Sequence, residues 1–252
     1  MFESSVATSK LKQITRDGLH NTPIVDHIIR KAKWTTQIFD SIHWDAYERA
    51  FQRLLRFYQY STAKLCHGLV NTNRQNQLYY GQSPPCPICS QEEETLVHVF
   101  TCSHPSATYH RQTRLAELCK DLDTAGTPLP VVQAVCHGFT KWDSDPTMKS
   151  VRALTTGSLR GADAVLTTAF REQFTFIGWY HLCLGRISKK WALAVQHYVP
   201  PRAHTDGSLH WASIFIKALW KYSKALWAFR NEIVHGATVE EQVNRQLDTL
   251  RQ

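Results

Sequence analysis

The segment Ser208–Gly236, SLHWASIFIKALWKYSKALWAFRNEIVHG, decides the fold class of this chain. Its apolar residues recur at helical spacing and form two stripes. The first stripe consists of Trp211, Phe215, Leu219, Tyr222, Leu226, Phe229 and Ile233. The second lies near Trp220, Trp227 and Val234. A helix that is apolar on two faces is usually buried between neighbours, so this segment predicts a long helix inside a helical protein.

The rest of the chain also has mainly helical patterns, without the alternating runs that require a β-sheet. Further helices are predicted to begin near Thr22 and to cover residues 42–68, 107–122, 129–139, 162–176 and 187–198. The sequence DTAGTPLP, residues 123–130, is rich in Gly, Pro and Thr and marks a boundary. We therefore expect an all-α helical bundle in two parts, residues 1–123 and 129–252, with a small zinc knuckle inserted in the first.

Two local predictions concern the first of these parts. In the predicted helix of residues 42–68, one apolar stripe is expected to face the core, and it consists of Tyr47, Phe51, Leu54, Leu55 and Tyr58. The segment GLVNTNRQNQLYYGQSPP, residues 68–85, is polar and contains the helix breakers Gly and Pro. It predicts a loop with one short helical turn.

Composition and charge narrow the class of protein. With 252 residues, of which 43% are hydrophobic, the chain can build a substantial core. The formal net charge of +8 favours a polyanionic partner such as nucleic acid. Residues 1–10 are polar and lack the apolar stretch of a secretory signal, and no window approaches a membrane span. We expect an intracellular protein, nuclear or cytoplasmic, that is neither secreted nor bound to a membrane.

Cysteine and histidine spacing predicts a zinc site. The chain has seven cysteines and no export signal, which favours reduced thiols or metal ligands over disulfides. Residues 84–102, PPCPICSQEEETLVHVFTC, contain the spacing Cys-x2-Cys-x8-His-x3-Cys. The cysteine pair can form a turn with both sulfurs directed to one point, and the last two ligands share a face if their segment is helical. We predict a closed, structural zinc site formed by Cys86, Cys89, His98 and Cys102.

Two alternatives to this ligand set stay open in the sequence. One is a metal-free arrangement of three buried thiols beside a surface histidine, and the other replaces His98 by His104 as a ligand. The other cysteines have no nearby partner in the sequence and are expected in the core, where free cysteine is common. They are Cys66, Cys119, Cys136 and Cys183.

The zinc pattern and its flanks resemble the region that follows the polymerase domain in retroelement reverse transcriptases of the non-LTR type. The resemblance covers about residues 42–110 and, more weakly, residues 226–236. The motif elements of that family correspond here to Cys86, Pro87, Cys89, Glu94, Thr95, His98, Phe100 and Cys102. The resemblance implies a zinc-binding accessory region that holds nucleic acid, or steadies the polyprotein, beside the polymerase domain of the same element.

The catalytic part of such an enzyme has no counterpart in this sequence. A polymerase palm needs paired metal-binding aspartates, and the chain contains no Asp-Asp dipeptide. Phosphate-binding loops, zinc-protease helices and nucleophile elbows are also missing from the sequence. The sequence therefore predicts a module without catalysis of its own.

Residues 229–236, FRNEIVHG, suggest a second function. This string resembles the active motif of HEPN-type ribonucleases, all-α proteins that cleave RNA without a metal. The resemblance implies that His235 transfers a proton, Arg230 stabilises phosphate charge and Asn231 orients the group. The interpretation we prefer is structural: Arg230 and Asn231 fasten the helix to a neighbour, and His235 with Gly236 ends it.

Basic and aromatic residues interleave in residues 48–60 and 216–230. Basic faces can follow phosphates and exposed rings can stack on bases, although most of these rings have core spacing. Arg56, Lys64 and Arg74 are the predicted nucleic-acid contacts. A third hypothesis is a purely structural, zinc-stapled helical protein, which would bind zinc and have no affinity for nucleic acid.

Overall fold

The computed structural model describes residues 22–145, 164–198 and 207–238, together with residues 240, 241, 243, 244 and 247. The chain divides into two compact units, Met1–Ile42 and His43–Gln252. The first unit contains α2 (Thr22–Ala32) and α3 (Thr36–Ser41). The polar start of the chain, residues 1–10, lies outside the described residues.

The second unit is built from helices throughout its described residues. Its described residues contain no β-strand, and an isolated β-bridge joins Pro85 to Glu93. The predicted all-α class is therefore confirmed. None of the described helices combines the length and the apolar character that crossing a bilayer requires.

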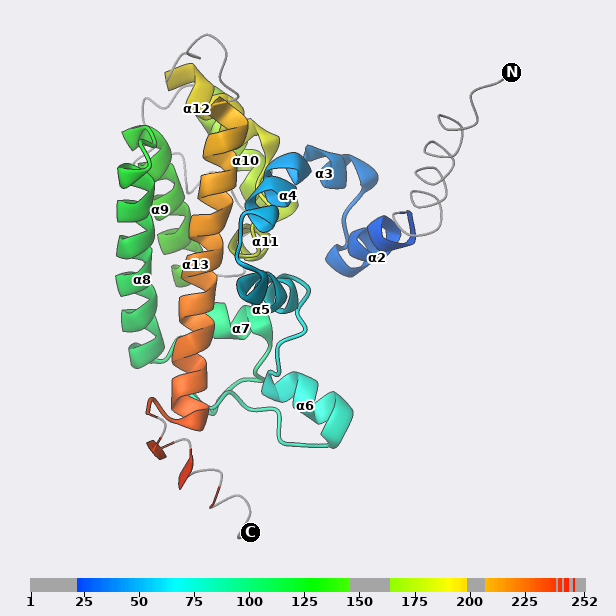
Figure 1. Cartoon of the computed structure of the whole chain (residues 1–252), viewed down its shortest axis with the longest axis vertical. Coiled ribbons are helices and arrows are strands. Elements are labelled where there is room, and N and C mark those ends of the chain that lie inside the picture. Colours follow the sequence, from blue (N-terminus) through cyan, green and yellow to red (C-terminus); the bar gives the residue numbers. More distant parts are fainter. Residues whose placement is uncertain are drawn as a thin grey trace, which may run out of the picture. The chain divides into compact units, whose positions relative to one another are not determined.

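The centre of the second unit is α13 (Gly207–His235), the long orange helix of Figure 1. It packs against α4 (Trp44–Gln52), α8 (Pro105–Thr124) and α12 (Lys189–Tyr198). Shorter contacts are made with α5 (Arg56–Cys66), α7 (Leu96–Thr101) and α11 (Trp179–Cys183). Both predicted stripes contribute to its burial, because Phe215 and Leu219 are fully enclosed and Trp220 is 1% exposed. The prediction of a helix buried on two faces is confirmed.

The predicted single helix over residues 42–68 is wrong, because the chain breaks between α4 and α5 (Arg56–Cys66). The Gln59 side-chain amide donates to the carbonyl oxygens of Phe51 and Leu54, both at 3.2 Å, and so satisfies acceptors at the break. Only the first part of the predicted stripe reaches the core: Leu55 and Tyr58 are 73% and 49% exposed. The change of helix direction leaves Leu55 largely in solvent and Tyr58 half-exposed beside Lys224 of α13.

Residues predicted as a loop with one turn instead form α6 (Asn73–Tyr80). The Thr72 hydroxyl accepts a hydrogen bond from the Gln75 amide at 3.3 Å and caps the start of the helix. Gly81 ends it in the left-handed conformation, with φ of +67°. Both end signals are present in the sequence, and they support a two-turn helix despite its polar composition.

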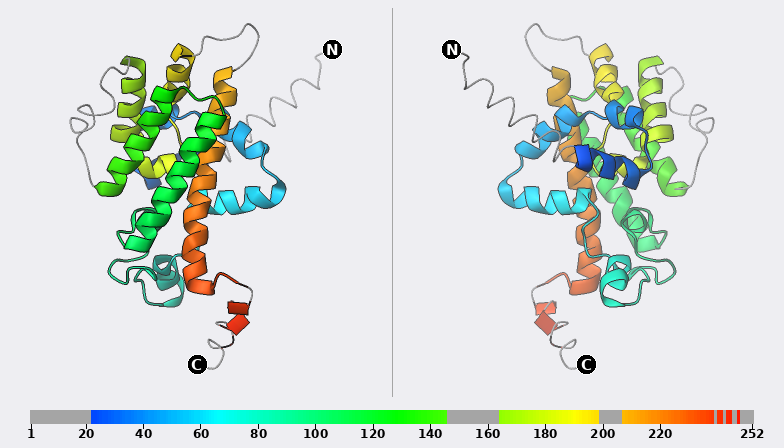
Figure 2. Two further views of the ribbon diagram at one scale, coloured as in Figure 1. Left: turned by 90° about the vertical axis from the view of Figure 1, so that its left-hand side faces the viewer. Right: turned by 90° about the vertical axis from the view of Figure 1, so that its right-hand side faces the viewer.

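Helices α8 and α9 (Leu129–Ser144) form a hairpin, lie side by side, and place α8 next to α13 (Figure 1, Figure 2). Residues 125–128, within the predicted boundary, form the turn between them, where Gly126 has φ of +74°. Side chains from before and after this turn, such as Leu118 and Phe139, belong to one hydrophobic cluster.

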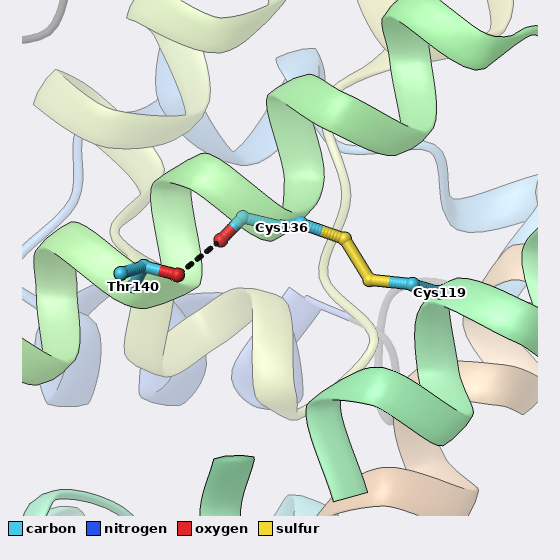
Figure 3. The surroundings of a disulfide bond; sticks show 3 residues. All are labelled: Cys119, Cys136 and Thr140. Carbon is cyan, nitrogen blue, oxygen red and sulfur yellow. Dashed lines mark hydrogen bonds between the residues drawn. A yellow bond between two sulfur atoms is a disulfide. The ribbon is translucent and has the colours of Figure 1, made fainter. Parts of the chain in front are cut away.

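A disulfide bond joins Cys119 of α8 to Cys136 of α9 (Figure 3). The expectation that these two cysteines are unpaired core residues is therefore wrong. They are 17 residues apart in sequence, and the hairpin brings their Cα atoms within 6.7 Å of each other. The other two of that group, Cys66 and Cys183, are free and buried as expected.

The remaining helices, α10 (Ala164–Glu172), α11 (Trp179–Cys183) and α12, pack around a π-helical turn, Gln173–Ile177. The Gln173 side chain is fully buried, and its amide donates to the carbonyl oxygens of Gly178 and Arg186 at 3.2 Å. Its carbonyl accepts from the Ser188 amide at 3.0 Å. The buried glutamine thus substitutes for the backbone hydrogen bonds that regular helices would make at this corner.

We predict that Gly138→Ala destabilises the second unit. A Cβ atom at position 138 would overlap the indole ring of the buried Trp179, and both the ring and the helix backbone are enclosed. Overpacking of this kind costs about 1–3 kcal/mol, measured as the free energy of unfolding in denaturant. The exposed Ser144→Ala on the same helix is the control and is expected to change stability by less than about 0.5 kcal/mol. Equal stability of the two variants would contradict this packing.

Candidate metal centre

The four predicted ligands come together in one cluster. One ligand atom from each of Cys86, Cys89, His98 and Cys102 lies within 4.8 Å of the others. Three of the residues are buried and Cys89 is half-buried. The predicted positioning of these side chains for a metal ion is confirmed.

The first two ligands belong to a tight turn. The Cys86 amide donates to the Glu92 carbonyl oxygen at 2.7 Å, and the Ser90 amide donates back to the Cys86 carbonyl oxygen at 2.8 Å. Ser90 takes the left-handed conformation, with φ of +55°. The Ile88 amide points at the Cys86 sulfur, 3.4 Å away, as expected for a knuckle whose amides stabilise a thiolate.

The other two ligands are supplied by α7 (Leu96–Thr101) and the residue that follows it, Cys102. The helix starts at Thr95, whose hydroxyl accepts from the His98 amide at 3.0 Å. His98 directs Nε2 at the Cys89 sulfur, 3.4 Å away, and its Nδ1–H donates to Glu92 Oε2 at 3.2 Å. The carboxylate holds the ring orientation that leaves Nε2 facing the cluster, as is usual for metal-binding histidines.

This donor set fits zinc. Three thiolates and one imidazole form a common tetrahedral zinc site, in which a sulfur and a nitrogen ligand lie about 3.6 Å apart. The Cys89–His98 separation of 3.4 Å is close to that value. Since all four ligands come from the protein, the set has no open coordination position, and it can stabilise the fold but cannot activate a water.

The two alternative ligand sets do not match the structure. His98 is 6% exposed and bonded on both ring nitrogens, so it is not a surface histidine. His104 is exposed and caps α8 instead, where its Nδ1 accepts from the Ser106 amide at 3.3 Å.

The ligand side chains also share protons strongly. The hydrogen bond from the Cys102 thiol lowers the pKa of Cys86 to about 3, and the hydrogen bond to the Cys86 sulfur raises the pKa of Cys102 in turn. The same sulfur raises the pKa of His98 to about 9. These pKa shifts arise mainly from hydrogen bonds among the ligand side chains themselves. A bound divalent ion takes the place of the shared protons, since metal ligands are deprotonated.

A buried ion pair fastens the segment that carries the four candidate metal ligands, residues 86–102, to α13. Glu94 has no exposed surface and Arg230 is 3% exposed. Arg230 Nε donates to Glu94 Oε1 at 2.5 Å, and Nη2 donates to Oε2 at 2.6 Å, which is the two-pronged geometry of strong arginine–carboxylate pairs. The Asn73 amide, at the start of α6, donates to the same carboxylate at 2.5 Å.

A second buried arginine, Arg111 of α8, holds the other end of the segment. Its Nη1 donates to the Cys102 carbonyl oxygen at 2.8 Å, and Nη2 forms an ion pair with Asp143 of α9. Arg111 is 5% exposed. Cys102, the last of the four candidate metal ligands, is thereby tied to the α8–α9 hairpin. The sequence gives no sign of this role, because Arg111 is indistinguishable there from the exposed arginines of other helices.

The residues of the ribonuclease hypothesis occupy a helix end. Arg230 forms an ion pair with Glu94, and its Nη1 also donates to Asn231 Oδ1 at 3.3 Å. His235 is the exposed last residue of α13. The Gly236 amide donates to the Glu232 carbonyl oxygen at 2.9 Å with φ of +100°, which closes the helix. The preferred prediction, that Arg230 fastens the helix to a neighbour, is confirmed.

The predicted nucleic-acid contacts lie on two helices. Arg56 and Lys64 are exposed on α5, and the Lys64 ammonium lies 4.6 Å from the centre of the Tyr60 ring. Arg74, on α6, is half-buried, bonds to Gln77 and pairs with Glu93 at 3.3 Å. Whether these side chains bind nucleic acid stays a prediction.

Comparisons with protein-family models, with curated proteins and with solved structures gave no match for this chain. The function proposed below therefore rests on the geometry of the metal centre and on the sequence pattern around it.

We predict that Glu94→Gln destabilises the protein by about 3–5 kcal/mol, because it leaves the buried Arg230 guanidinium without a countercharge. The adjacent Glu93→Gln is the matched control, since Glu93 is 54% exposed and its pair with Arg74 is worth about 1 kcal/mol or less. Denaturant unfolding of both variants measures the difference. A Glu94→Gln protein as stable as Glu93→Gln would show that the pair contributes little.

We predict that His98→Ala abolishes stoichiometric zinc binding, whereas His104→Ala retains it. The first variant removes one of four ligands, and the second changes an exposed helix cap near the cluster. Zinc content is measured by elemental analysis of protein purified without chelator. Zinc retained by His98→Ala and lost by His104→Ala would reassign the fourth ligand.

Proposed function

We propose that this chain is a zinc-stapled accessory module of a retroelement-derived reverse transcriptase, and that it binds nucleic acid without catalysing a reaction. The observation that carries the proposal is the closed set of three cysteines and one histidine, set into the junction of α7, α8 and α13. A site with four protein ligands serves structure, which is the role expected of an accessory module.

The order of residues in the centre supports the link to retroelements. The turn with Cys86 and Cys89, the buried Glu94, the capping Thr95 and the helix with His98 follow one another as in the resembling family. Each has a separate physical task in the fold: ligation, anchoring to α13, or capping. A match that joins several such tasks is more specific than ligand spacing alone.

The surface supports nucleic acid as the partner. The net charge is +8, and lysines lie over exposed rings on α5: Lys64 over Tyr60 at 4.6 Å and Lys224 over Tyr58 at 5.2 Å. Tyr60 is 68% exposed. Paired rings and cations are what base stacking and phosphate binding use on single strands.

The ribonuclease hypothesis receives no such support. A phosphate-stabilising arginine must reach the substrate, and Arg230 is buried in an ion pair whose carboxylate would have to be released first. Without Arg230, the motif retains only His235 as a group able to transfer a proton.

We predict salt-dependent binding of nucleic acid by the zinc-loaded protein. Affinity for a fluorescein-labelled single-stranded oligonucleotide, measured by fluorescence anisotropy, is expected to fall steeply as salt rises, because counterions are released on binding. The Cys86→Ser/Cys102→Ser variant, which cannot hold zinc, is expected to lose the metal and to unfold the segment between α6 and α8. A protein with stoichiometric zinc and no affinity for single or double strands at low salt would instead be a purely structural scaffold.

A further inference from the structure

A cleft of about 530 Å³ lies on a face of α13 away from the zinc centre's ligands. It is lined by residues of α13, by Leu54 from the break between α4 and α5, by Tyr58 of α5 and by Asp121 of α8. Its volume falls within the range of about 300–1,000 Å³ that is typical of ligand sites. The lining combines apolar side chains with a row of cations.

The cations of the cleft are Lys217, Lys221 and Lys224, which follow one another at helical spacing on α13. The Lys221 ammonium forms an ion pair with Asp121 Oδ2 at 2.6 Å, so its charge is largely neutralised within the protein. Lys217 is exposed, and Lys224 is half-buried with its ammonium 3.4 Å from the Tyr58 carbonyl oxygen. Burial lowers the pKa of Lys224, which is the direction expected when an ammonium group has lost solvent. An anion bound beside it would replace that solvent.

The apolar part of the cleft combines the aliphatic residues Leu54, Ile214 and Ala218 with the aromatic residues Tyr58 and Trp220. Trp220 lines it while being 1% exposed, and its ring packs edge-on against Tyr47, with ring centres 5.0 Å apart. Tyr58 stands at the edge of the cleft, 49% exposed, with Lys224 5.2 Å from its ring centre. A planar group that enters the cleft can therefore lie against Tyr58 while its charged portion reaches the lysines.

We infer that this cleft binds one nucleotide unit of a single-stranded nucleic acid, with the base against Tyr58 and the phosphates at Lys217 and Lys224. This inference rests on the function proposed above and locates its binding surface. The lining indicates the chemistry of the ligand. A flat apolar ring that packs against Tyr58 and a negative charge that pairs with the lysines must belong to the same molecule. Because the lysines run along a helix axis, a strand that follows them places successive phosphates near successive cations.

An acidic peptide is the main competing occupant, since its carboxylates can also pair with the lysine ammonium groups. It is less favoured because carboxylate side chains leave the exposed face of Tyr58 and the apolar cleft unfilled. The two occupants are separated by their probes, an oligothymidylate and a glutamate-rich helical peptide, each labelled with fluorescein.

The test compares two double variants that remove the same charge. Lys217→Gln/Lys224→Gln changes the cleft, whereas Lys120→Gln/Lys189→Gln changes exposed lysines elsewhere on α8 and α12. We expect the cleft variant to bind the oligonucleotide at least tenfold more weakly, and its salt slope to fall by about 1.4, the value for two phosphate contacts on a single strand. The control variant is expected to lose about twofold or less.

A second pair of variants isolates the ring. Tyr58→Leu is expected to weaken oligonucleotide binding about tenfold, while Tyr58→Phe, which keeps the stacking surface, stays close to the unaltered protein. Thermal melting of every variant must match the unaltered protein, so that loss of binding is not loss of fold.

The outcomes separate this inference from the proposed function. If the unaltered protein binds the oligonucleotide and both double variants weaken it equally, the nucleic-acid function stands and the cleft is not the site. If the unaltered protein does not bind it, the nucleic-acid function itself falls and the cleft inference falls with it. Binding of the acidic peptide alone, lost in the cleft variant, would assign the cleft to a protein partner.

Discussion

The ion pair between Glu94 and Arg230 is the interaction on which the arrangement of the second unit depends. Both charges are enclosed by the protein, and a buried charge is tolerated only when it is paired and hydrogen-bonded. The pair joins Glu94, which precedes the N-cap residue of α7, to the last turns of α13, more than one hundred residues later in the chain. It therefore fixes where the segment with the four metal ligands sits on the central helix.

The candidate metal centre and the arginines act on the same short segment. Arg230 holds it before α7, Arg111 holds the carbonyl of Cys102 after it, and the metal ligands close the turn between them. A segment of about twenty residues cannot bury enough apolar surface to order itself. A metal bound at these four ligands would stabilise the same segment that the two arginines hold, because the binding free energy of such a site contributes to folding.

The sequence predicts local features well where neighbouring residues supply the physical cause. The knuckle turn, the helix with His98 and the end of α13 at Gly236 depend on spacing, capping and backbone conformation, and all were predicted. The break at residues 53–55 and the exposure of Leu55 were not, since they depend on which face α13 covers. The two-turn length of α6 was missed because its polar composition outweighed its end signals, Thr72 and Gly81.

By itself, the sequence determined the helical class, the four side chains able to hold a metal and the helix that had to be buried, because periodicity and ligand chemistry are local properties. Only the tertiary structure decided what pairs across the chain. It joined Cys119 to Cys136, gave Glu94 its partner and brought Tyr58 to the lysines of α13. Contacts of this kind depend on how helices far apart in sequence pack together, and no spacing pattern encodes that.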